Sequence, residues 1–181
     1  MTGPCHCGRA VLMLALVAAL AARGARAADM PSAEDIDAIS HTLGFIDGMP
    51  HAGTIRIGVV YDGSAEGGGV DRVIEAIAAA AGPGATRLGA IPIAAADVGK
   101  PANVDALLLL PGLKGFAQGI TSAAAGRHLP TISTDPQCIE QQLCVLWVEA
   151  QPRVSVTLNT KLADALSVRV SPIFAMMVKR K

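Results

Sequence analysis

Two cysteines stand close together in a chain that has few of them. Cys138 and Cys144 are two of four cysteines and have five residues between them. Thiols at such a spacing can bind a metal, carry out redox chemistry or form a structural disulfide. Two thiols alone make a poor zinc site, because zinc takes four ligands and no histidine lies nearby in sequence. The CxxC spacing of thiol oxidoreductases is also absent.

The N-terminus sets the redox compartment and so bears on these thiols. Arg9 precedes the apolar run AVLMLALVAALAA, which has thirteen residues. That run is shorter than the roughly 20 residues of a membrane-spanning helix. Residues 1–27 therefore predict a secretory signal peptide, cleaved after about Ala27, and a periplasmic protein. An oxidising compartment favours a disulfide between Cys138 and Cys144, with free or partner-linked thiols as the alternative.

The remaining residues, 28–181, suit a single domain with a sizeable core. Removing three arginines and no acid from fifteen basic and fifteen acidic residues leaves a net charge of −3. This charge disfavours a nucleic-acid partner.

A glycine-rich stretch, YDGSAEGGGVDRV, lies where an α/β fold could hold a phosphate, between an expected strand and an expected helix. It lacks the G-x-G-x-x-G order of dinucleotide-binding loops and the lysine and hydroxyl of a P-loop. Asp62 and Glu66 would repel an anion. We therefore interpret Gly63–Gly69 as a flexible turn, and we expect no cofactor.

A ligand crevice is expected where parallel strands end. Three loops meet there, and their polar members are Asp62, Ser64, Lys114 and Asp135. Each of these residues can equally serve as a cap or a turn residue. No serine stands in a G-x-S-x-G elbow, and nothing in the sequence indicates a catalytic triad or a metal site. We therefore expect a binding protein and not an enzyme.

Alternating apolar strands and amphipathic helices must position these residues. Continuous apolar runs such as TIRIGVVYD predict strands buried on both faces. This alternation predicts a mostly parallel sheet with helices on its faces, and the last two strands, separated by QP, predict an antiparallel addition. The expected helices begin at Ser32, Val70, Leu113 and Thr160, and the expected strands are 54–62, 87–93, 104–112, 129–135, 144–150 and 153–159.

The second half of the chain resembles the YfiR family of periplasmic proteins. The segment LPTISTDPQCIEQQLCVLWVEAQPRVSVTLN is followed by a C-terminal stretch with a similar pattern. Phe45 alone stands for the aromatic residues of the family's N-terminal helix, and Ser167 replaces a family glycine. The matching positions near the C-terminus are Arg153, Val156 to Asn159, Ala163, Ala165, Leu166, Val168, Val170, Ser171 and Pro172.

This resemblance implies a Rossmann-like, three-layer α/β domain over residues 28–181. It also implies a non-catalytic regulator that restrains an inner-membrane sensor, such as a diguanylate cyclase, by protein contact. Cys138 and Cys144 fall where a family disulfide would lie.

A second interpretation is a single-lobed periplasmic protein that binds a small molecule for an ABC transporter. The segments VDALLLLPG and RHLPTIST resemble parts of periplasmic solute-binding proteins. Such proteins normally have two lobes and about twice this length. The sequence is also compatible with a homodimer.

Overall fold

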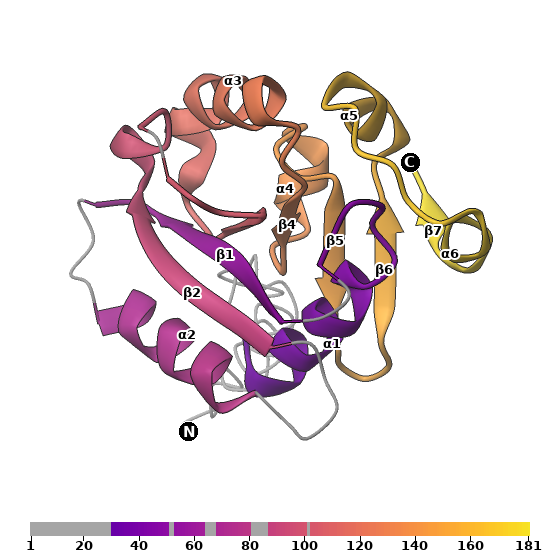
Figure 1. Cartoon of the computed structure of the whole chain (residues 1–181), viewed down its shortest axis with the longest axis horizontal. Coiled ribbons are helices and arrows are strands. Elements are labelled where there is room, and N and C mark those ends of the chain that lie inside the picture. Colours follow the sequence, from indigo (N-terminus) through magenta and orange to yellow (C-terminus); the bar gives the residue numbers. More distant parts are fainter. Residues whose placement is uncertain (1–29, 51–52, 64–67, 81–86, 101) are drawn as a thin grey trace, which may run out of the picture.

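The computed structural model describes residues 30–50, 53–63, 68–80, 87–100 and 102–181 (Figure 1). The predicted signal peptide and residues 64–67 of the glycine-rich stretch, Ser64 among them, lie outside these residues. Seven strands form one sheet in the order β2-β1-β3-β4-β5-β6-β7. They are β1 (Thr54–Tyr61), β2 (Arg87–Ala94), β3 (Ala106–Leu109), β4 (Thr131–Ser133), β5 (Leu146–Glu149), β6 (Ser155–Leu158) and β7 (Lys179–Arg180).

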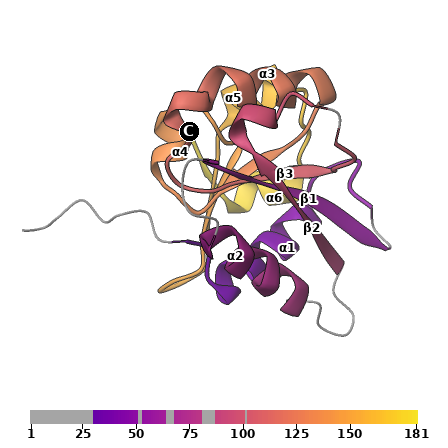
Figure 2. The same cartoon turned by 90° about the vertical axis from the view of Figure 1, so that its left-hand side faces the viewer.

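Helices cover both faces of the sheet. Figure 2 shows α1 and α2 on one side of it and α3 and α5 on the other. The helices are α1 (Ala33–Leu43), α2 (Gly68–Ala79), α3 (Ala117–Arg127), α4 (Gln137–Glu140), α5 (Thr160–Ala165) and α6 (Pro172–Met177), with short 3-10 turns η2 (Ala95–Asp97) and η3 (Leu113–Phe116). The predicted fold class, a three-layer and mostly parallel α/β sheet, is confirmed.

The core is built where the sequence is most apolar. Strand β1 buries Ile55, Ile57, Val59 and Val60 almost completely. It pairs in parallel with β2 along one edge and with β3 along the other. Because helices cover both faces of the sheet, its side chains are buried on both sides. Pro92, which lacks an amide donor, lies in β2 at the edge of the sheet, where a strand tolerates proline.

Helix α1 begins as its sequence predicts. The Ser32 hydroxyl accepts a hydrogen bond from the Asp35 amide (3.1 Å), and the Asp35 carboxylate accepts one from the Ser32 amide (3.0 Å). This capping box satisfies two donors at the start of the helix. The second Asp35 oxygen accepts from the Ala150 amide (2.9 Å), which ties α1 to the end of β5.

The expected antiparallel addition is the β5–β6 hairpin, in which β6 runs antiparallel to β5. Strand β5 itself continues the parallel sheet beside β4. The four-residue helix α4, which the sequence does not predict, allows this parallel pairing. It returns the chain to the start of the sheet between β4 and β5.

Candidate functional site

The carboxyl ends of β1, β3 and β4 meet at one edge of the sheet, which we call the carboxyl edge. The register aligns Val60 with Leu109, and Leu108 with Ile132. The Leu110 amide donates to the Val60 carbonyl (3.0 Å), so the two loops leave the sheet side by side. A crevice at this position is the usual ligand site of open α/β sheets.

The predicted site residues follow these strands, and the structure describes three of the four. Asp62 is half-buried directly after β1. Lys114 is exposed in η3, beyond the end of β3, and Asp135 is half-buried after β4. Ser64 lies outside the described residues. A ligand role for these side chains therefore stays a prediction.

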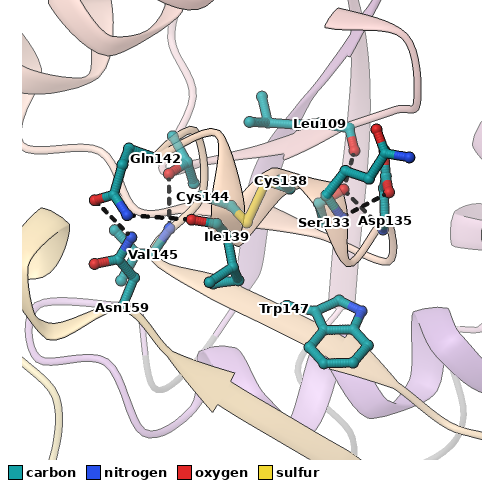
Figure 3. The surroundings of a disulfide bond; sticks show 12 residues. Leu109, Ser133, Asp135, Cys138, Ile139, Gln142, Cys144, Val145, Trp147 and Asn159 are labelled. Carbon is teal, nitrogen blue, oxygen red and sulfur yellow. Dashed lines mark hydrogen bonds between the residues drawn. A yellow bond between two sulfur atoms is a disulfide. The ribbon is translucent and has the colours of Figure 1, made fainter. Parts of the chain in front are cut away.

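Asp135 has a structural task as well. The Ser133 hydroxyl donates to the Leu109 carbonyl (2.8 Å) and accepts from the Asp135 amide (3.1 Å). An Asp135 carboxylate oxygen in turn accepts from the Gln137 amide (2.9 Å). Figure 3 shows this turn, which leads from β4 into α4 and is hydrogen-bonded to the end of β3. The turn thus holds the loop after β4 in one conformation.

Thr134 is a candidate site residue that the sequence does not single out. Its hydroxyl oxygen is buried and has no hydrogen-bond partner among the described residues. Its carbonyl accepts a hydrogen bond from the indole Nε1 of Trp147 (3.1 Å), which is half-buried on β5. A buried hydroxyl without a partner is uncommon in a folded protein and calls for an explanation. The sequence offered only an ordinary threonine in the loop ISTDP.

The predicted disulfide supports the same loop. Cys138 in α4 and Cys144 just before β5 are bonded, with their Cα atoms 5.5 Å apart (Figure 3). Both side chains are buried. The Leu143 amide also donates to the Cys138 carbonyl (2.9 Å), so covalent and hydrogen bonds close the turn together. The prediction of a structural bridge is confirmed.

A bidentate salt bridge lies at the opposite edge, where β1 and β3 begin. The Arg56 guanidinium donates to both Asp105 oxygens (2.8 and 3.1 Å), and the Arg56 amide donates as well (2.8 Å). The hydrogen bonds from Arg56 hold the pKa of Asp105 below its usual value, and burial opposes this shift. This pair fixes the register of two central strands and lies away from the carboxyl edge.

A hollow that we call the apolar groove lies between α1, the β5–β6 hairpin and α6. Its volume is about 700 Å³. The rings of Phe45 and Phe174 stack there with centroids 4.8 Å apart. Val154, Val156 and Met177 also line it. The sequence does not predict this groove, because its walls come from segments far apart in the chain.

Other chemistry finds little support in the described part of the chain. No group of three or more His, Cys, Asp or Glu residues there could hold a metal ion. His128 contacts the Leu166 carbonyl through Nδ1 (3.2 Å), and His41 lies 3.7 Å from Asp37 on the surface of α1. Among the described helices, none is long and apolar enough to cross a membrane.

Comparison with known proteins shows the fold. No family model matches the chain, and no curated protein matches it. The ABC domain in complex with L-Trp from Streptococcus pneumoniae aligns with a TM-score of 0.57 and 14% identity, over 83% of this chain and 60% of its own. A conserved domain protein from Vibrio cholerae aligns with a TM-score of 0.59 and 14% identity, over 84% of this chain and 61% of its own. The chain thus spans about three fifths of the length of each protein.

Proposed function

We propose that this chain is a ligand-binding α/β protein that holds a small, amino-acid-like solute at its carboxyl edge. The observation that carries the proposal is the Thr134 hydroxyl, which is buried at this edge without a partner among the described residues. A ligand group would satisfy it. Lys114 and Asp135 place opposite charges on neighbouring loops of the same edge, which suits a zwitterion. The likeness to a domain that binds L-Trp supports this class of solute.

The protein would then resemble one lobe of a substrate-binding protein for an ABC transporter. Its coverage of about three fifths of the two similar structures supports a lobe that closes against a further part. A half-open site on one lobe would bind its solute weakly, since one side of the ligand stays in water.

Calorimetric titration with L-Trp, other amino acids, nucleotides and small anions tests the proposal. We expect at least one amino acid to bind, and Thr134→Val to weaken its binding about tenfold through the lost hydrogen bond. Thr121→Val is the matched control, since Thr121 bonds to Ala117 within α3. Binding that ignores Thr134→Val, or no binding by any solute, would contradict the proposal.

A second function is a regulator that restrains a membrane sensor by contact, and the Cys138–Cys144 bond favours it. This bond lies where the resemblance to the YfiR family would place a disulfide. A pull-down from membranes, with and without a reductant, tests this function. Recovery of an inner-membrane sensor that the reductant releases would support it, and equal recovery in both conditions would count against it.

A further inference from the structure

The apolar groove continues into an exposed apolar surface. Ile173, Met176 and Met177 of α6 are 64, 78 and 66% exposed, and Val154 of the hairpin is 66% exposed. Met177 and Val154 line the groove directly. A contiguous apolar surface of this kind usually marks an interaction site, because it is unfavourable in water. Methionine side chains suit such a surface, since they adapt their shape to a partner.

The charges around this surface are separated along β6. Glu34 and Asp37 line the groove on the first turns of α1, at the hairpin end, and no lysine or arginine is among its described lining residues. The basic residues 179–181 directly follow Val178, the last lining residue, and are exposed. Lys181 lies 4.0 Å from the Glu140 carboxylate, so Lys179 and Arg180 supply the net positive charge of this end. Arg180 pairs with Leu158 of β6. Leu158 lies four residues beyond Val154, and four residues of a strand span about 13 Å. The surface therefore has an acidic end, an apolar middle and a basic end.

From this pattern we propose that the groove is a dimer interface that a second copy of this chain occupies through a two-fold axis. A two-fold axis that crosses the apolar middle, perpendicular to the line from the acidic end to the basic end, brings the acidic end of each copy against the basic end of the other. It also packs the two α6 helices together and removes their exposed methionines from water. A partner with one sign of charge would satisfy only one end. Arg153 is exposed at the hairpin turn, and its one positive charge against the two carboxylates of Glu34 and Asp37 still leaves the acidic end net negative.

Sedimentation velocity measures the proposed dimerisation. It is carried out over a range of concentrations on the protein as the cell processes it. We expect a dimer at micromolar concentration. Met177→Asp should weaken it at least tenfold, because a charge would be buried at the centre of the interface. Val154→Asp is a second variant of the same kind. Both side chains are exposed in the single chain, so we expect both variants to fold. Circular dichroism tests this independently.

A charge swap distinguishes this interface from any other dimer. Glu34→Lys and Arg180→Glu should each weaken the dimer several-fold, through like charges across the axis. The double variant restores opposite charges at both ends and should recover most of the affinity. Arg72→Glu on the exposed surface of α2 is the matched control and should change nothing. Three outcomes would overturn the proposal. The protein stays monomeric at about 100 micromolar, roughly the upper end of the micromolar range, or the dimer withstands Met177→Asp. The third is a double variant whose dimer dissociates more readily than the dimers of both single variants.

Discussion

Asp105 shows how one side chain sets both strand register and pH dependence. Its carboxylate receives three hydrogen bonds from Arg56, and its pKa is lowered as a result. A carboxyl with a lowered folded pKa adds stability above its unfolded pKa, near 3.9, and loses it as the pH falls through the folded value. The free energy of unfolding of Asp105→Asn should therefore be about 1–2 kcal/mol below that of the wild type at pH 7.

The same difference should shrink below about pH 4. Urea denaturation of both proteins at pH 7 and pH 3 measures it. Asp164→Asn, at an exposed position of α5, is the control and should stay near the wild type at both values. An undiminished difference at pH 3 would show that Asp105 acts through packing and not through its charge.

Gly58 is a second residue whose type the packing dictates. A Cβ atom at this position would lie 2.7 Å from Ile93 Cδ1 and 2.9 Å from Leu107 Cδ2. Both contacts are too short, and both partners belong to strands beside β1. We expect Gly58→Ala to destabilise the protein by about 1–3 kcal/mol through overpacking.

Gly126, in the last turn of α3, offers the matched comparison, because a Cβ there meets nothing within 4 Å. Gly126→Ala should be neutral or stabilising by up to about 1 kcal/mol, since alanine favours the helix. Chemical denaturation ranks the two variants. Equal effects would mean that the neighbours of Gly58 move aside without cost.

At the scale of elements, the sequence predicts best where local pattern and burial agree. The capping box at Ser32 and the continuous apolar run of β1 predict their elements closely, because each depends on neighbours in the chain. The orientation of β5 depends on α4, whose four residues carry no helical periodicity. The apolar groove joins Phe45 to Phe174, and no local pattern predicts such a contact.

The candidate site follows the same division. The positions of Asp62, Lys114 and Asp135 at the strand ends follow from the order of elements, so the sequence predicts the loops. The sequence does not predict that the Thr134 hydroxyl is buried without a partner, because that depends on how the neighbouring strand β5 packs.

The disulfide holds α4 against the segment that precedes β5. It links Cys138 and Cys144 across a short loop. In the loop-entropy model such a bond contributes roughly 2 kcal/mol. The double variant Cys138→Ser with Cys144→Ser should lose about this amount in urea denaturation, and the wild type in reductant should lose the same. A reductant should leave the variant unchanged, and a further loss there would indicate an effect unrelated to this bond.

At the scale of the whole molecule, Trp147 joins the parallel sheet to its C-terminal extension. It is the single tryptophan of the chain, and it lies on β5 between β4 and β6. Its indole also bonds to the loop after β4. Its fluorescence therefore reports on both halves of the sheet at once.

One continuous sheet predicts one cooperative transition. The core of β1 and β3 reaches β6 through β4 and β5 without an interruption in the strand order. The urea transitions followed by Trp147 fluorescence and by far-ultraviolet circular dichroism should therefore coincide. A fluorescence change at lower urea would mean that β5 to β7 open before the rest. In that case the apolar groove, which the β5–β6 hairpin and α6 line, should be lost before the core of β1 and β3 unfolds.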